Sequence, residues 1–68
     1  MEEFQLKGAY IELMALLKLK GIAESGGQAG MIITEGYIKR NGEVEFRKRA
    51  KLVAGDIIQF ENKKIKIV

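Results

Sequence analysis

Residues 37–46 read Tyr37-Ile38-Lys39-Arg40-Asn41-Gly42-Glu43-Val44-Glu45-Phe46, and this stretch decides the fold. Asn41 and Gly42 both tolerate a positive φ angle, which the two central residues of a type I′ turn need. On either side of them, apolar and charged side chains alternate as they do in strands. The stretch therefore predicts a β-hairpin, with Ile38 and Val44 paired on its inner face and Phe46 in the core.

A helix is predicted directly before the hairpin. The Ser25 hydroxyl can accept a hydrogen bond from the N–H of Gln28, and the Gln28 side chain can reach back to the N–H of Ser25, which together make a capping box. Gly36 can end this helix in a left-handed conformation. Its buried stripe would consist of Ala29, Ile32 and Ile33.

A second helical pattern lies further upstream, from Ala9 to Lys20. Gly21 can cap its C-terminus, and the lysines in its last turn complement the helix dipole. Apolar side chains recur there at helical spacing, namely Tyr10, Leu13, Met14 and Leu17. This pattern predicts a helix over residues 9–20, with Tyr10 packed in its apolar face.

Short strands are expected near both ends of the chain. The alternation of apolar and polar residues predicts them at Glu2–Lys7, Ile57–Phe60 and Lys64–Val68, the last with Ile65 and Ile67 facing inward. No linker or internal repeat divides the chain. We therefore expect a single α+β domain over residues 1–68.

The composition argues against an enzyme. The 68 residues include no Cys, His or Trp, which excludes zinc sites and histidine acid–base chemistry. Ser25, Thr34 and Asp56 are the only residues of their types, so a nucleophile would have no evident activator. We expect no catalytic residue, metal ligand, cofactor or small-molecule substrate. The acidic start and the interrupted apolar runs predict a soluble, cytoplasmic protein without membrane contact.

Positive charge is concentrated in one stretch. Six of the twelve basic residues fall between Lys39 and Lys51, and residues 37–51 contain only two acidic ones. Residues 1–36 carry a net charge of −2 and residues 52–68 a net charge of +1, so the overall +3 hides a polarised molecule. A dense cationic field on a rigid turn suits a polyanion, because each cation can displace a counterion from a phosphate chain. An ordinary solvated face is the plainer alternative.

The order of these elements resembles a known RNA-binding family. Three pieces carry the resemblance: Ser25-Gly26-Gly27-Gln28-Ala29, then Ile32-Ile33 to Gly36 with Ile38, Asn41-Gly42 and Val44, and then Lys51-Leu52 with Gly55-Asp56-Ile57-Ile58. Together they look like the RNA-binding domain first described in the small-subunit ribosomal protein S4, also called the alpha-L RNA-binding motif. The short, stand-alone bacterial members are the most similar.

The resemblance implies an α+β fold in which two packed α-helices lie against a small, mainly antiparallel β-sheet. It implies a second helix from about Gly26 to Glu35 and a hairpin from Tyr37 to Phe46, with RNA lying across both. Many relatives carry a basic residue where this chain has Gly30, and others carry one where it has Gly26. Without them the second helix has no positive side chain, so binding should depend more on the hairpin and on the Arg47 to Lys51 connection.

The candidate RNA-binding residues combine these cations with the start of the second helix. A helix N-terminus offers unpaired N–H donors, and glycines there let a phosphate approach the backbone. A purely structural cap or turn remains the alternative reading for the Ser25 and Asn41 segments. Tyr37, at the start of the hairpin, is a candidate for stacking on an unpaired base. The expected site consists of Ser25, Gly26, Gly27, Gln28, Tyr37, Lys39, Arg40, Asn41, Arg47, Lys48, Arg49 and Lys51.

The leading hypothesis is a non-enzymatic protein that docks structured RNA, with ribosomal or transfer RNA favoured by the resemblance and ribosomal particles as further partners. The alternative is a protein–protein interaction or ribosome-assembly module with a basic docking face. The sequence leaves open which RNA is bound, the oligomeric state and the cellular process.

Overall fold

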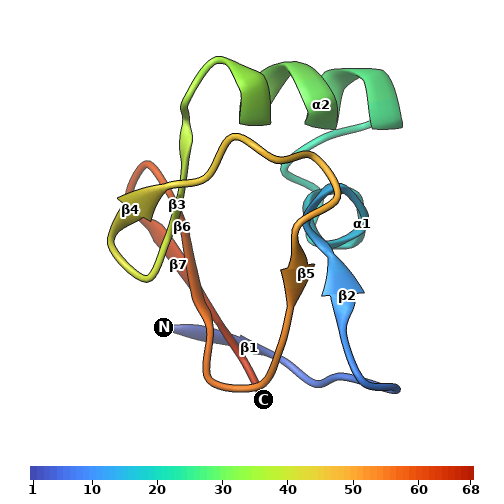
Figure 1. Cartoon of the computed structure of the whole chain (residues 1–68), viewed down its shortest axis with the longest axis vertical. Helices are drawn as coiled ribbons and strands as arrows, with labels where there is room; N and C mark the ends of the chain where they lie inside the picture. Colours follow the sequence, from blue (N-terminus) through green and yellow to red (C-terminus); the bar gives the residue numbers. More distant parts are fainter.

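Two α-helices and seven short strands make up the computed structural model, which describes residues 1–68 (Figure 1). The helices are α1 (Leu13–Leu19) and α2 (Gly26–Thr34). The strands are β1 (Glu2–Phe4), β2 (Ile11–Glu12), β3 (Ile38–Arg40), β4 (Glu43–Val44), β5 (Lys51–Leu52), β6 (Ile57–Phe60) and β7 (Lys63–Ile67).

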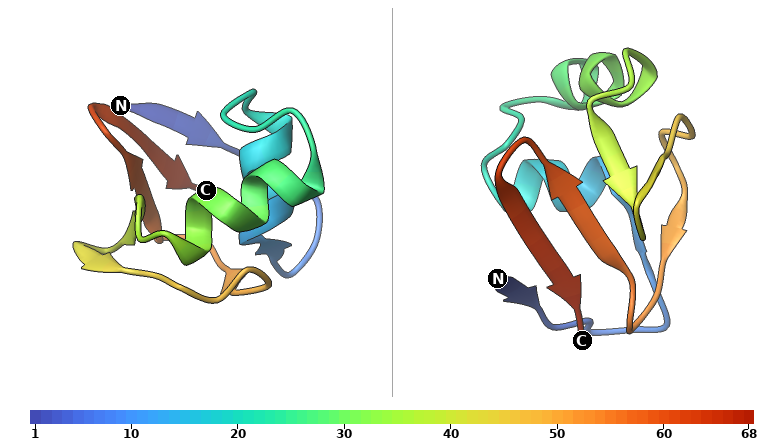
Figure 2. Two further views of the ribbon diagram at one scale, coloured as in Figure 1. Left: turned by 90° about the horizontal axis from the view of Figure 1, so that it is seen from above. Right: turned by 90° about the vertical axis from the view of Figure 1, so that its left-hand side faces the viewer.

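Five of the strands form one sheet in the order β1-β7-β6-β3-β4, and β2 pairs with β5 in a separate two-stranded ladder. Only the β1–β7 pair is parallel. Because β1 pairs with β7 in parallel, both termini lie at the same edge of the sheet, with Met1 beside the start of β7 and Val68 beside the end of β1 (Figures 1 and 2). The expected α+β fold of two packed helices and a mainly antiparallel sheet is confirmed.

The core lies between the helices and the sheet. Its fully buried side chains are Leu13, Leu16 and Leu17 of α1, Ile33 of α2, and Ile38, Leu52, Ile58, Ile65 and Ile67 of the strands. In β7 the isoleucines point inward while Lys64 and Lys66 are exposed, as the alternation predicts. These apolar side chains pack the helices against the sheet.

The first helix is shorter than predicted. It begins at Leu13 rather than Ala9, because Ile11 and Glu12 pair with β5 instead of joining the helix. Tyr10 therefore does not pack in a helical core, and 45% of its surface remains exposed. At the other end Gly21 has φ +74°, the left-handed conformation expected after a helix.

The second helix follows its prediction closely. The Ser25 Oγ accepts a hydrogen bond from the N–H of Gln28 at 3.1 Å. The Gln28 side chain reaches back as well, but its oxygen accepts from the N–H of Glu24 at 2.6 Å rather than from that of Ser25. Gly36, with φ +86°, ends the helix. Ala29 and Ile33 are buried as predicted.

The hairpin turn is confirmed, but its predicted side-chain pairing is wrong. Asn41 and Gly42 have φ +53° and +89°. A two-residue loop sets Lys39 opposite Val44, and the N–H of Glu45 donates to the carbonyl of Ile38 at 2.9 Å, so Ile38 cannot face Val44. Val44 therefore lies on the outer face, and Phe46, two residues on, is 59% exposed rather than in the core.

The turn makes a specific demand on Gly42, because its φ lies in the left-handed region. Replacing Gly42 by Ala should lower the free energy of unfolding by about 1–2 kcal/mol, the cost of that conformation for a residue with a Cβ. Gly8 is a matched control, since an added Cβ meets nothing within 4 Å at either position and only Gly42 has a positive φ. Urea unfolding of Gly42→Ala and Gly8→Ala measures the difference, and equal stability of the two variants contradicts the assignment.

Candidate nucleic-acid interface

The connection from β4 to β5, residues 45–50, crosses beneath α2 and is called the basic loop below (Figure 1). Its backbone is fixed to the start of α1. The N–H of Met14 donates to the carbonyl of Lys48 at 3.1 Å, and the N–H of Leu13 donates to the carbonyl of Ala50 at 3.0 Å. The N-cap residue Glu12 makes no side-chain cap. The loop carbonyls thus satisfy helix donors that would otherwise be unpaired, and this ties the loop down.

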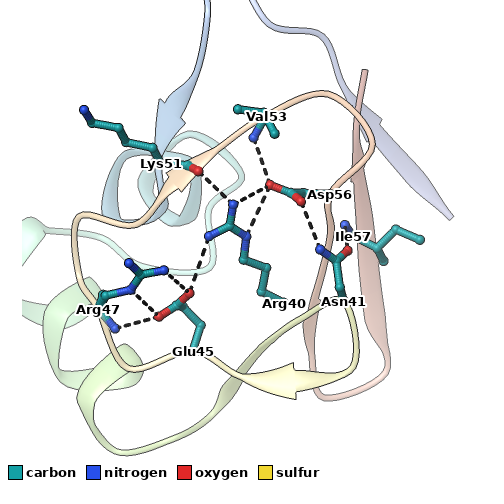
Figure 3. A network of polar contacts seen from close by, with 8 residues as sticks. All are labelled: Arg40, Asn41, Glu45, Arg47, Lys51, Val53, Asp56 and Ile57. Atoms are coloured by element: carbon teal, nitrogen blue, oxygen red, sulfur yellow. Dashed lines mark hydrogen bonds and ion pairs between the residues drawn. The ribbon is translucent and has the colours of Figure 1, made fainter.

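A buried carboxylate holds the other side of the loop (Figure 3). Asp56 is 7% exposed. Its Oδ2 accepts from the N–H of Val53 at 2.9 Å and from Arg40, through Nη2 at 2.9 Å and Nε at 3.2 Å. Its Oδ1 accepts from the Asn41 side chain at 2.9 Å. This single side chain therefore joins the hairpin turn to the turn that precedes β6.

The ionised form of Asp56 is favoured in spite of burial. Burial alone would raise its pKa, but hydrogen bonds from Val53, Asn41 and Arg40 and the positive charge of Arg40 outweigh that effect, so that the pKa lies below its usual value. The carboxylate consequently remains a strong acceptor for the groups around it.

Two of the predicted RNA-binding residues belong to this network. The Arg40 guanidinium also donates to the Lys51 carbonyl at 2.9 Å and lies 3.5 Å from Glu45, and its side chain is 22% exposed. The Asn41 side chain accepts from the N–H of Ile57 at 2.8 Å in addition to its bond with Asp56. The structure thus gives Arg40 and Asn41 structural partners, which agrees with the structural reading of the Asn41 turn, and their contact with RNA stays a prediction.

Arg47 is exposed but paired. Its Nε and Nη2 lie 3.1 and 3.2 Å from the two carboxylate oxygens of Glu45, and its backbone N–H donates to the same carboxylate. These hydrogen bonds, led by the side-chain bond from Arg47 and outweighing the opposing effect of burial, lower the pKa of Glu45 to about 2. The pair orients the Arg47 side chain, which is 73% exposed, at the edge of the loop.

Four cations of the cluster have no ion-pair partner: Lys39, Lys48, Arg49 and Lys51. All four are exposed. The Lys51 ammonium lies 5.0 Å from the centre of the Tyr10 ring, a cation–π contact that sequence reasoning missed. A shallow depression of about 360 Å³ is lined by Arg40, Arg47, Arg49, Ala50 and Lys51. The cluster therefore divides into paired cations that support the loop and unpaired cations that face solvent.

The start of α2 lies next to this surface. Gly26 and Gly27 donate no hydrogen bond within the protein, because Ser25 caps only the N–H of Gln28. A Cβ on Gly26 would lie 3.5 Å from the Met14 side chain, and the backbone of Met14 bonds to Lys48. The start of α2 and the basic loop thus both contact Met14. Tyr37, at the far end of α2, is 57% exposed.

Comparison with known proteins agrees with this architecture. A family model described as S4 domain matches residues 4–68. The chain belongs to the S4 domain family. It is 47% identical over 62 residues to YbcJ of Escherichia coli (strain K12), covering 91% of this chain and 89% of YbcJ, and the same figures hold for YbcJ of Shigella flexneri.

The solution structure of YbcJ from E. coli superposes with a TM-score of 0.74 at 46% identity, covering all of this chain and 87% of that one. That structure is described as revealing an alpha-L motif involved in RNA binding. The resemblance of this chain to the S4-type, alpha-L domain is therefore confirmed.

Within this S4 domain, α2 is not left without positive charge. Gly30 is buried, and a Cβ there would lie 3.2 Å from Cδ and 3.7 Å from Nζ of Lys48. The Lys48 side chain therefore lies along the helix in the space that a side chain of residue 30 would take. The basic loop thus places a positive charge beside α2, although the helix itself has no basic side chain. No local signal in the sequence links these two positions.

The structure contains neither a cluster of metal-ligating side chains nor a membrane-spanning helix. No group of three or more His, Cys, Asp or Glu side chains could hold a metal ion. Neither helix has the length and apolar character needed to cross a lipid bilayer.

The ion pair between Glu45 and Arg47 makes the stability of the fold depend on pH. Because its pKa is lowered from 4.5 to about 2 in the folded state, Glu45 contributes stability that is present above about pH 4.5 and lost as the pH falls toward 2. At pH 7 the free energy of unfolding of Glu45→Gln should be about 1 kcal/mol lower than that of the wild type, a modest difference because Arg47 is largely in water. Between pH 4.5 and 2 the stability of Glu45→Gln should fall less with decreasing pH than that of the wild type. Glu43→Gln is the control, since Glu43 is exposed and unpaired. Identical urea-unfolding profiles for Glu45→Gln and wild type between pH 2 and 5 would contradict this role.

Proposed function

We propose that this protein is a single, non-enzymatic RNA-binding domain that docks on structured RNA through the basic loop, Lys39 and the N-terminus of α2. One observation carries the proposal: four unpaired cations lie on and around a loop that is fixed on both sides by hydrogen bonds. Membership of the S4 domain family, and the RNA-binding motif described for YbcJ, support the same reading.

Electrostatic attraction to phosphates would supply most of the affinity. Lys48, Arg49 and Lys51 can each approach a phosphate without first breaking an ion pair, whereas Arg47 must share its charge with Glu45. The anchoring of the loop carbonyls by α1 reduces the conformational entropy that binding would otherwise cost. A preformed cationic surface of this kind recognises the shape and phosphate spacing of a folded RNA.

The N-terminus of α2 would add short-range contacts. The N–H groups of Gly26 and Gly27 are unpaired, and the helix dipole favours an anion there. The Lys48 ammonium lies against the same helix one turn further on, beside Gly30. A phosphate seated at this end could meet both.

Ribosomal or transfer RNA is the proposed target class, and a cytoplasmic role on ribosomal particles would follow from it. Both are folded RNAs in which helices and loops present phosphates at fixed spacings. The proposal rests on the S4 family membership for this choice, because the charges alone fit any polyanion.

Salt dependence tests the proposal directly. With four unpaired cations engaged, the logarithm of the association constant should fall with the logarithm of salt concentration at a slope of about −3 to −4. The double variant Lys48→Ala, Arg49→Ala should reduce the magnitude of that slope by about 2 and weaken binding to a folded ribosomal RNA fragment.

The matched control is Lys64→Ala, Lys66→Ala, which removes the same number of exposed positive charges from β7. Fluorescence anisotropy with labelled RNA measures all three proteins, and circular dichroism melting confirms that each is folded. If the two double variants lose affinity equally, net charge rather than the basic loop governs binding. If the wild type binds no RNA but retains a protein partner after nuclease treatment, the interaction-module alternative replaces the proposal.

A further inference from the structure

Two aromatic rings of the hairpin are left in solvent. Tyr37 and Phe46 are 57% and 59% exposed, and neither belongs to the core. Tyr37 directly precedes the buried Ile38, and Phe46 follows Glu45, whose N–H bonds to Ile38. Both therefore lie at the end of the hairpin that adjoins α2, with Lys39 and Val44 paired just beyond them.

The Phe46 ring has a defined position although it is exposed. A Cβ on Gly36 would lie 3.4 Å from Cε1 of Phe46 and 3.8 Å from Cγ1 of Val44. The edge of the ring thus rests against the backbone of Gly36, where α2 ends and where the positive φ of +86° already favours glycine. A ring supported on one side and open on the other forms a platform rather than a loose side chain.

An unpaired cation lies beside this platform. Lys39 lies opposite Val44 on the outer face and has no ion-pair partner, whereas Arg47, which follows Phe46 directly, is paired with Glu45. An aromatic face beside unpaired positive charge is complementary to a nucleotide, because the base offers an apolar π-face and its phosphate a negative charge. An apolar protein partner would match the ring but not the lysine.

We propose that Phe46, together with Tyr37, stacks on an unpaired base of the bound RNA while Lys39 contacts the adjoining phosphate. This inference rests on the proposed RNA-binding function. It narrows the ligand to an RNA that has a bulged, looped or otherwise unstacked nucleotide beside the RNA helix that docks on the protein. Bases inside a continuous A-form duplex are stacked on each other, and the deep, narrow major groove keeps side chains from reaching them, so a plain duplex cannot use the platform.

The test compares two RNAs that differ in one feature: a fully paired stem, and the same stem with one bulged 2-aminopurine. Phe46→Leu keeps an apolar side chain against Gly36 but removes the flat ring. We expect it to weaken binding of the bulged RNA about tenfold and binding of the paired stem less than twofold, since stacking on one aromatic is worth roughly that factor. The wild type should quench 2-aminopurine fluorescence, and Phe46→Leu should not.

Two controls keep the result interpretable. Leu19→Ala removes an equally exposed apolar side chain from α1, on a different face, and should change neither affinity. Phe46→Tyr keeps the ring and should retain both the quenching and the preference for the bulge, so it serves as the readout if Phe46→Leu lowers the melting temperature.

The possible failures are distinct. If the wild type binds both RNAs equally and Phe46→Leu has no effect, the basic loop still binds RNA and the stacking inference is wrong. If the wild type binds neither RNA, the proposed function fails and the inference fails with it. If Phe46→Leu instead abolishes retention of a protein after nuclease treatment, the platform serves a protein partner and the inference is overturned.

Discussion

The Asp56 carboxylate is the constraint on which the rest of the structure depends. It is one of the few charged groups withdrawn from solvent, and every hydrogen bond it accepts comes from a segment that the interface needs: Arg40 and Asn41 of the hairpin and Val53 of the following turn. Arg40 then extends the connection to Glu45 and to the carbonyl of Lys51, on either side of the basic loop. No buried side-chain nitrogen or oxygen is left without a partner. A charge so fully paired stabilises one arrangement of these loops, because removing any partner would leave its buried counterpart unsatisfied.

This arrangement separates the basic residues by role. Arg40 and Arg47 are neutralised by Asp56 and Glu45 and hold the loop in shape, whereas the unpaired lysines and Arg49 supply the field that reaches a ligand. A small domain of 68 residues has little core with which to stiffen a long loop. The basic loop is held instead by polar contacts and by the N–H groups of α1, and Ala50 is the one residue of the loop that is buried in the core.

The elements that were predicted correctly from the sequence are determined by residues that are close together along the chain. The α2 cap, the Asn41-Gly42 turn and the alternation in β7 each depend on residues within a few positions of one another. The late start of α1, at Leu13 rather than Ala9, was missed because β2 pairs with a strand about forty residues away. The role of Arg40 was missed for the same reason, since Asp56 lies sixteen positions along the chain. The exposure of Val44 and Phe46 could have been found, because a two-residue loop fixes the register by counting outward from the turn.

The most direct test of the account maps the bound surface on the folded protein by ¹⁵N–¹H correlation NMR, titrating a folded ribosomal RNA fragment into the labelled chain. The account predicts that amide shifts change at residues 26–31, at 37–39 and along the basic loop, while those of β1 and β7 stay in place. Changes centred on β1 and β7, or a basic loop whose amides show fast internal motion before RNA is added, would contradict a cationic surface held rigid by Asp56.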